Sequence, residues 1–442
     1  MRGRGTRRST AFETLVRSAP LKRLPSPALR WQICALLFAS TVINYIDRQS
    51  LSLLAPFLKI EHHWTNTDYA NIVIAFRVAY TIGQTVFGRW MDRIGTRRGL
   101  SLTVLFYSIV SLATSLARGF YSFATFRFLL GGAESANWPA ATKAVSEWFP
   151  KQERALATAL FDSGSSLGAA VAPFIVLEIY FHFGWRPAFM VPGALGFLWI
   201  VFWRSIYPHG ATGIGPEVER QTRSLSSGRT PWRDLLKLPQ TWGTIIAKSF
   251  TDPVWFFVTD WFPIYLLAKG INLRSSLTAI WIPFVAADAG NFFGGAASGY
   301  LIRRGWPLGR ARKALVVFGG IGVTALIPTV FTTNLYAIAL LFALATFCYG
   351  SFTTMANVLP ADLYHDDSVA TVSGMSGTGA GLGTIVAFEL IGHFSDLRRG
   401  AATHAFDPIV IAAGLIPFVG MILVLALVRN TKATEEGLVQ KI

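Results

Sequence analysis

Charged residues are scarce in this sequence. Of its 442 residues, only 14% are Asp, Glu, Lys or Arg, whereas a typical soluble domain carries about 25%. Hydrophobic residues make up 52%, with 34 Phe and 14 Trp, and the mean hydropathy is +0.44. The shortage of charge excludes an ordinary soluble domain. Together with the apolar excess, it indicates an integral membrane protein that crosses the bilayer several times.

Cysteine and histidine are too few, or too scattered, for the chemistry that they usually support. Cys34 and Cys348 both lie in apolar runs, so we expect them to pack in the core rather than to form a disulfide framework. The seven histidines show no zinc-ligand spacing, and no nucleophile and base gather near one membrane face. We therefore expect no metal, no cofactor and no enzyme activity.

Acidic residues are outnumbered by basic residues, 24 to 40, which gives a net charge of +16. Nucleic-acid binding is the first alternative for such a charge, but the basic residues fall between apolar runs rather than on one soluble domain. They follow the positive-inside rule, so both termini are predicted to be cytoplasmic. The acidic loop 360–368 is the exception to this pattern, and pairing with the basic loops is the only explanation that the sequence offers.

Twelve apolar segments are each long enough to cross a bilayer as a helix, which needs about 20 residues. Their approximate extents are 31–58, 69–90, 99–117, 120–148, 155–180, 187–207, 241–268, 275–302, 313–332, 334–359, 369–395 and 406–428.

The longest polar gap divides these segments six and six, which is the pattern of a pseudo-symmetric transporter. The predicted parts are a cytoplasmic tail (1–30), an N-terminal six-helix bundle (31–207), a cytoplasmic linker (208–240), a C-terminal six-helix bundle (241–430) and a second cytoplasmic tail (431–442). A Gly-x-x-x-charge-Arg pattern follows both the second and the eighth segment, which is weak support for an internal repeat. The predicted fold is therefore all-α, with twelve transmembrane helices.

One loop and several shorter stretches resemble a known family. GRWMDRIGTRR (88–98) is similar to the signature loop of the major facilitator superfamily. NYIDRQ (44–49), the stretch 127–158, GWRPAF (185–190) and TDPVWFF (251–257) resemble its anion:cation symporters, and most of all bacterial sugar-acid carriers for hexuronates and galactonates. The resemblance covers nearly all of residues 31–430. It implies a transporter that works by alternating access and that we expect to function as a monomer.

Two adjacent charges interrupt the first apolar segment. Ionisable groups at bilayer depth cost about 2.5–3.5 kcal/mol and usually mark function. Asp47 and Arg48 project about 100° apart on a helix, so each needs its own partner on another helix or in a wet cavity. Asn44 shares the face of Arg48, and we expect it to contact the substrate as well. Arginine suits carboxylate binding, often through two parallel bonds.

The fourth segment carries Arg127 and Glu134 two turns apart on one face, and Arg127 is a plausible partner for Asp47. Burial raises a carboxylate's pKa and a nearby arginine lowers it, so such a group can exchange a proton near neutral pH. The family resemblance implies that Asp47 and Glu134 carry protons and that Arg48 binds the substrate anion. Arg127 either takes part in proton coupling or braces Asp47.

The second and fifth segments contain two departures from the family pattern. Arg77 and Asp162 stand where uncharged residues are usual, so they either form a compensating pair or contact substrate. The resemblance implies substrate contact for Tyr80, and we place Ser165 in the same site.

On the seventh segment, Lys248 and Asp252 are four residues apart and can pair, and Trp255 shares their face. Trp255 either packs or stacks on a sugar ring. The family position of Asn357 implies a substrate contact. Asp260 and Glu389 are further polar departures that the pattern does not place.

The signature loop is predicted to act mechanically. We expect Gly88 and Asp92 to hold the outward-open state, and Arg93, Arg97 and Arg98 to favour an anionic membrane surface. The alternative is that the loop only determines topology. The gating residues predicted from this loop are Gly88, Asp92, Arg93, Gly95, Arg97 and Arg98.

The predicted function is proton-coupled symport of a small organic anion, most simply a sugar acid such as a hexuronate or aldonate. Its partners would be the anion, protons and the lipid bilayer. An anion antiporter of the same fold and a transporter-like sensor are the alternatives, although 208–240 is too short for a signalling domain. The positions of Arg77 and Asp162 leave a dicarboxylate possible as the substrate.

Overall fold

In the computed structural model, residues 27–64, 66–208, 230–271, 277–397 and 406–428 are described below. Every regular segment among them is helical. The helices are α2 (Pro27–Glu61), α3 (Asn66–Ile94), α4 (Thr96–Thr114), α5 (Phe120–Glu134), α6 (Asn137–Trp148), α7 (Arg154–Phe183), α8 (Trp185–Ile206), α10 (Trp232–Leu235), α11 (Pro239–Ala268), α12 (Leu277–Arg303), α13 (Leu308–Gly322), the 3-10 helix η2 (Val323–Phe331), α14 (Leu335–Leu363), α15 (Asp366–Leu397) and α16 (Asp407–Leu427).

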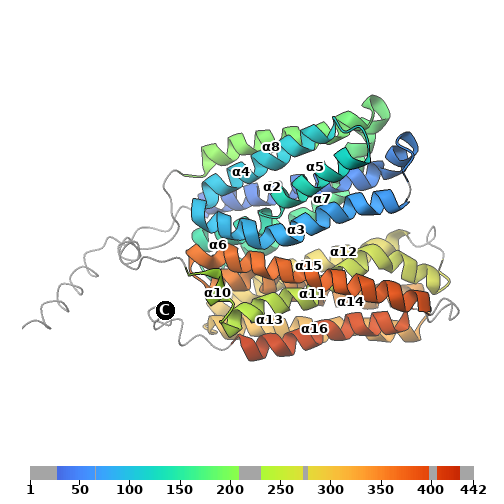
Figure 1. The fold of residues 1–442 in the computed structure, drawn as a ribbon. Helices are drawn as coiled ribbons and strands as arrows, with labels where there is room; N and C mark the ends of the chain where they lie inside the picture. The colour runs from blue at the N-terminus through green and yellow to red at the C-terminus, as the bar shows by residue number, and fades with distance from the viewer. Residues whose placement is uncertain (1–26, 65, 209–229, 272–276, 398–405, 429–442) are drawn as a thin grey trace, which may run out of the picture.

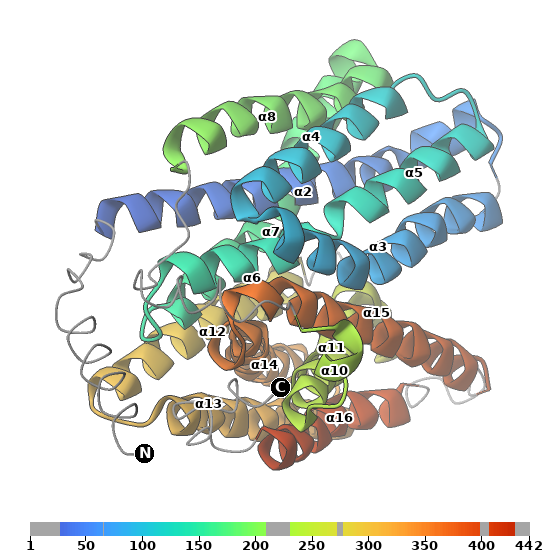
Figure 2. The ribbon, with the colours of Figure 1, turned by 60° about the vertical axis from the view of Figure 1, so that its left-hand side comes forward.

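The helices form two groups that lie against one another along their length. Helices α2 to α8 make one group and α10 to α16 make the other (Figure 1). Within the first group α2 packs on α7 and α4 packs on α8, and within the second α12 packs on α14 and α11 packs on α16. The groups meet mainly through α3 against α15 and α7 against α12. Figure 2 shows α6 beside α15 at the same interface.

The twelve predicted spans are helical over nearly all of their described residues, but the fourth is interrupted and the ninth changes from an α-helix to a 3-10 helix at Val323. Six of the described helices are long and apolar enough, by composition alone, to cross a membrane. Other spans, such as α3 and α12, fall below this measure because polar residues face the interface between the two groups. The prediction of helices from long apolar runs therefore holds even where the runs are interrupted.

The fourth predicted span differs from the prediction because it is broken in two. Helix α5 ends at Glu134 and α6 begins at Asn137. Pro139 lies three residues beyond the break, and a proline ring disturbs the carbonyl four residues before it, which here belongs to Ser135. The break therefore leaves Glu134 at the end of a helix in the middle of the bundle.

Small residues allow neighbouring spans to approach closely. A Cβ atom on Gly290 of α12 would overlap the carbonyl oxygen of Phe347 on α14, and one on Gly350 would overlap that of Ala287. Close approach through small residues is how membrane helices gain packing contacts without a hydrophobic driving force. The close contact between α12 and α14 therefore requires glycine at positions 290 and 350, because any larger side chain would overlap the backbone of the other helix.

Replacing Gly290 by alanine should separate α12 from α14, because the new methyl group meets backbone that cannot rotate away. We expect the free energy of unfolding to fall by about 1–3 kcal/mol, the usual cost of overpacking, in thermal or denaturant melts of the purified protein. Gly119→Ala is the matched control, because nothing lies within 4 Å of the added Cβ. Equal melting curves for the two variants would contradict this account of the helix pair.

Candidate functional site

A cavity of about 410 Å³ lies between the two helix groups. This volume is near the lower end of the range of about 300–1,000 Å³ that is typical of small-molecule sites. The cavity is lined by residues of α2, α3, α5, α6, α7, α11, α12, α14 and α15. The predicted site residues that line it are Arg48, Arg77, Tyr80, Arg127, Ser165, Trp255 and Asn357.

Arg48 projects from α2 into this cavity. Its Nε donates to Glu134 Oε2 at 2.7 Å, and its guanidinium lies 4.4 Å from the ring centre of Tyr80 and 5.0 Å from that of Tyr45. Arg48 Nη2 has no hydrogen-bond partner among the described residues. The ring of Phe76 lies 5.3 Å away as well, so one carboxylate and three aromatic rings surround the guanidinium, while Nη2 makes no hydrogen bond with the described residues.

Glu134 lies behind Arg48, and its side chain is fully buried. One carboxylate oxygen accepts the bond from Arg48, and the other, Oε1, has no partner among the described residues. A buried polar atom without a partner costs about 1–3 kcal/mol, and such atoms call for an explanation. Within the described residues, the Glu134 carboxylate is therefore bound through Arg48 alone.

Asp47 is buried on the other side of α2 and does not line the cavity. Its Oδ1 accepts a hydrogen bond from Ser111 of α4 at 2.9 Å, whereas Oδ2 has no partner among the described residues. Asp47 and Arg48 therefore have separate partners on different helices, as their angular separation predicts. Asn44, a predicted substrate contact, is also fully buried and does not line the cavity, and its side-chain amide has no hydrogen-bond partner among the described residues.

Arg127 is near both carboxylates, and their charges interact with it. No ion pair within 4 Å joins it to Asp47 in the described part of the chain, so the predicted direct pair is not formed. Its side chain is only 4% exposed, its Nε and Nη2 find no hydrogen-bond partner there, and it borders the cavity. Arg127 therefore joins the buried carboxylates to the cavity.

Lys248 connects two helices on the C-terminal side of the cavity. Its Nζ lies 3.2 Å from Asp252 Oδ2, one turn along α11, which confirms the predicted pair. The same Nζ donates to Asn357 Oδ1 on α14 at 2.8 Å. Sequence reasoning selected all three residues but did not connect Asn357 to the pair. The lysine therefore fixes the orientation of an amide that faces the cavity.

Asp162 borders the cavity from α7, but no ion pair within 4 Å joins it to Arg77, although both residues are described. The predicted compensating pair is therefore wrong. The charges that act on Asp162 are those of Lys248, Asp252 and Asp288, because α7 packs against α12 rather than α3 at this depth. Arg77 instead lies 5.7 Å from the ring centre of Phe256.

Asp288 is a cavity residue that sequence reasoning missed. Its Oδ1 accepts a hydrogen bond from Ser166 at 2.8 Å, across the α7–α12 contact. An aspartate in the apolar run 275–302 was a usable signal, since ionisable residues in spans are rare. Ser165, which was predicted, lines the cavity too, with its hydroxyl donating to the Asp162 carbonyl at 2.7 Å.

Trp255 forms an aromatic wall of the cavity. Its ring lies nearly parallel to that of Tyr349, with an interplanar angle of 7° and centroids 5.9 Å apart. Phe284 meets it edge-on at 5.6 Å. The partly exposed indole is both packed and available, so it can offer a face to the apolar side of a ring-shaped ligand. The two alternatives for this residue are thus compatible.

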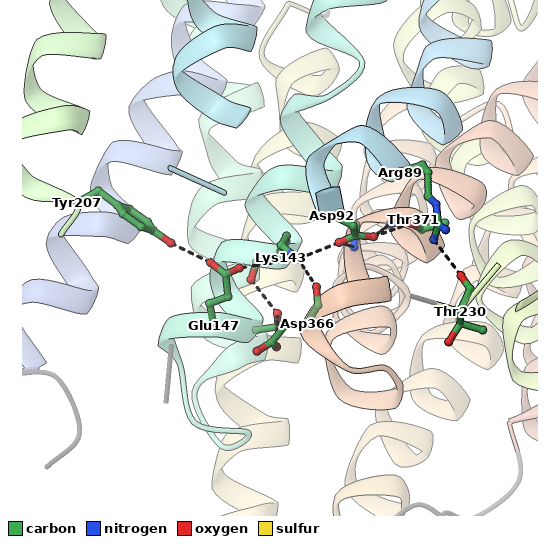
Figure 3. A network of polar contacts seen from close by, with 10 residues as sticks. Arg89, Asp92, Lys143, Glu147, Tyr207, Thr230, Asp366 and Thr371 are labelled. Carbon is green, nitrogen blue, oxygen red and sulfur yellow. Dashed lines mark hydrogen bonds and ion pairs between the residues drawn. The ribbon is translucent and has the colours of Figure 1, made fainter. Parts of the chain in front are cut away.

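A polar network that we call the latch joins the end of α3 to the start of α15 (Figure 3). Asp92 accepts hydrogen bonds from Lys143 Nζ at 2.9 Å and from the Thr371 backbone N–H at 2.7 Å. Lys143 also donates to the Asp366 carbonyl. Asp92 also accepts a hydrogen bond from the Thr371 hydroxyl, in the second turn of α15. Asp92 therefore binds the two helix groups together through α15.

Two other predicted gating residues behave differently from one another. A Cβ on Gly88 would overlap the Ala370 carbonyl, so this glycine allows α3 and α15 to touch. Arg97 was expected to face a lipid surface, but its guanidinium donates to the carbonyls of Tyr207 and Arg204, each at 2.8 Å. It caps the last turn of α8, where carbonyls lack helical partners. Arg93 and Arg98 are exposed.

Most of the predicted acidic loop 360–368 is helical, because α14 continues to Leu363 and α15 begins at Asp366. Its acidic side chains are explained by their neighbours at the latch end of the molecule. Asp362 pairs with Arg312 at 2.8 Å and with Arg154 of α7 at 3.4 Å. Arg312 also donates to the Lys151 carbonyl at 2.8 Å. The acidic side chains therefore neutralise basic loops, as expected, and add a second connection between the groups. The side chains of Asp260 and Glu389 lie outside the described residues.

The described residues contain no group of three or more His, Cys, Asp or Glu side chains that could hold a metal ion. What the site offers is an internal cavity, charged on its walls, between two helix groups joined at one end.

Comparisons with known proteins agree with this architecture. The family model described as Major Facilitator Superfamily matches residues 37–388, so the chain belongs to that superfamily. It is 28% identical over 424 residues to the hexuronate transporter of Escherichia coli strain K12, covering 92% of this chain and 96% of that one. It is 31% identical to the galacturonate transporter of Dickeya chrysanthemi over 279 residues, covering 60% of this chain and 81% of that one.

Among solved structures, the proton:xylose symporter XylE bound to 6-bromo-6-deoxy-D-glucose has a similar fold, with a TM-score of 0.74 and 14% identity. The alignment covers 92% of this chain and 98% of that one. The chain is therefore a multi-pass membrane transporter and not an enzyme.

Substituting Asp92 by asparagine should weaken the latch, because the amide loses the charge that Lys143 and the start of α15 bind. We expect a spin-label distance between Arg93→Cys and Asp367→Cys, both exposed sites at the latch end, to shift toward longer values. The surface variant Asp234→Asn, which loses only an exposed pair with Lys237, is the control. An unchanged distance distribution in Asp92→Asn would contradict a latch held by this carboxylate.

Proposed function

We propose that this protein carries a small organic anion, specifically a sugar acid of the hexuronate or aldonate type, together with protons by alternating access. The observation that supports the proposal most directly is the Arg48–Glu134 pair at the cavity wall. The names of the two curated relatives support the substrate class. Tyr80, Trp255 and Asn357, which border the same cavity, supply ring contacts and hydrogen bonds of the kind that a sugar needs.

The ion pair provides a physical basis for coupling. While Glu134 is ionised, it occupies the Arg48 Nε at 2.7 Å and competes with any other carboxylate for the guanidinium. Protonation of Glu134 removes this competitor and leaves the full positive charge to the substrate. Substrate carboxylate and proton therefore bind together, and neither is retained well without the other. In this scheme Asp47 is the second proton site, which communicates with the cavity past Arg127.

The latch supports an assignment of state and orientation. The latch end carries the basic loops, so we place it at the cytoplasmic side of a bacterial inner membrane, with both termini there. A closed latch then corresponds to a transporter that is closed toward the cytoplasm. Breaking the contacts of Asp92 and Asp362 would let the two groups rock and release the substrate and protons inside. The cavity and both latch connections lie within one chain, so we propose that the monomer is the functional unit.

Glu134→Gln should abolish proton coupling, because the amide cannot exchange a proton while Arg48 loses its competing carboxylate. In proteoliposomes with an imposed pH gradient, we expect accumulation of labelled galacturonate above the external concentration to be lost. Exchange of internal for external galacturonate should persist. Glu178→Gln, on the exposed end of α7, is the matched control. Gradient-driven accumulation that survives in Glu134→Gln would instead favour an anion antiporter or another coupling site.

Arg48→Lys should weaken substrate binding, because an ammonium cannot form the two parallel bonds of a guanidinium. A charged hydrogen bond contributes about 1.5–3 kcal/mol, so we expect KM for galacturonate to rise roughly tenfold or more. The comparison variant is Arg186→Lys, an exposed arginine that lies over Trp185. A KM equal to that of the unaltered protein would exclude Arg48 as the anion anchor.

A further inference from the structure

The cavity has two chemically different regions. Three of its four cationic residues, Arg48, Arg77 and Arg127, come from α2, α3 and α5, and the fourth, Lys248, comes from α11. Its acidic residues, Asp162, Asp252 and Asp288, come from α7, α11 and α12. Tyr45 interacts electrostatically with Arg48 and also with Asp162 and Asp252, so it lies between the two regions. A ligand that fills the cavity therefore meets opposite charge at its two ends.

The acidic region is only partly neutralised. Lys248 pairs with Asp252 at 3.2 Å and acts on Asp162 through its charge. Asp288 accepts a neutral hydrogen bond from Ser166 at 2.8 Å. Three carboxyl groups therefore share one ammonium group at this end, and they offer many more hydrogen-bond acceptors than donors.

In the cationic region, several guanidinium nitrogens have no hydrogen-bond acceptor among the described residues. Arg127 is more than nine-tenths buried, lines the cavity, and has two nitrogens without partners in the described part of the chain. Arg48 has one such nitrogen, Nη2. Buried donors without partners favour a ligand that brings a carboxylate to this end.

We propose that the cavity selects a sugar acid with a single carboxylate, whose opposite end bears hydroxyl donors, and that it discriminates against the corresponding dicarboxylate. This inference rests on the proposed function and specifies the substrate class within it. The carboxylate docks at the arginines, and the distal hydroxyls donate to Asp162 and Asp288. Hydrogen bonds in which one partner is ionised are roughly twice as strong as neutral ones.

A dicarboxylate of the same chain length cannot make this arrangement. Its second carboxylate would replace hydroxyl donors with an acceptor of like charge beside three carboxyl groups. Juxtaposed like charges cost several kcal/mol at an interface. Specificity here is therefore built from repulsion at one end as well as attraction at the other.

The test compares ligands on the full-length purified protein without a pH gradient, so that coupling does not enter. Galacturonate, galactonate and galactarate compete with labelled galacturonate for binding. We expect the first two to compete similarly and galactarate to compete about tenfold less well or worse. Galactarate competing as well as galacturonate would overturn the inference. Failure of the protein to bind or transport either monocarboxylate would instead overturn the proposed function.

Two single-residue variants test which acidic side chains weaken the binding of the dicarboxylate. Each of the variants Asp162→Asn and Asp288→Asn removes a repelling charge, so each should reduce the difference in binding affinity between galacturonate and galactarate. The control Glu178→Gln should leave this difference unchanged. If Asp162→Asn fails to fold, Asp288→Asn serves alone, since its carboxylate is held by one serine hydroxyl. An unchanged difference in folded variants of both sites would show that these acids do not set specificity.

Discussion

The free-energy cost of burying charged side chains between membrane-spanning helices determines how the charged residues of this protein pair. Arg48 and Glu134 lie where ionisable groups are expensive, and each reduces the cost for the other at 2.7 Å. A fully satisfied pair would be inert, but both partners keep unpaired atoms among the described residues. Each partner therefore stabilises the burial of the other, while the pair still leaves hydrogen-bonding atoms of both side chains unpaired in the described residues.

The same constraint explains the contacts at the latch end. Asp92 uses the start of α15 and Lys143, whereas Asp362 uses two arginines. The two connections differ in chemistry, because Asp92 accepts hydrogen bonds from Thr371 as well as from Lys143, whereas Asp362 pairs with arginines. Both ion pairs are buried, so salt should screen them much less than it screens exposed pairs.

Much of this arrangement was predictable from sequence. Long apolar runs identified the spans, and charges within them identified Arg48, Glu134, Lys248 and Asp252 as unusual. The partners were harder to predict, because they depend on which helices meet at a given depth. Asp162, for example, interacts with charged residues of α11 and α12 rather than with Arg77, because α7 packs against α12. Residue spacing predicted that Asn44 shares a helix face with Arg48, but it could not predict that only Arg48 would line the cavity.

The interruption at Ser135 and Ala136 has a mechanical consequence. The segment before it ends in Glu134, and the segment after it carries Lys143. One continuous stretch of chain thus carries the partner of Arg48 at the interruption and the partner of Asp92 nine residues further along. A change of angle between α5 and α6 would move Glu134 relative to Lys143, and it would therefore couple the contact at the cavity wall to the contact between α3 and α15.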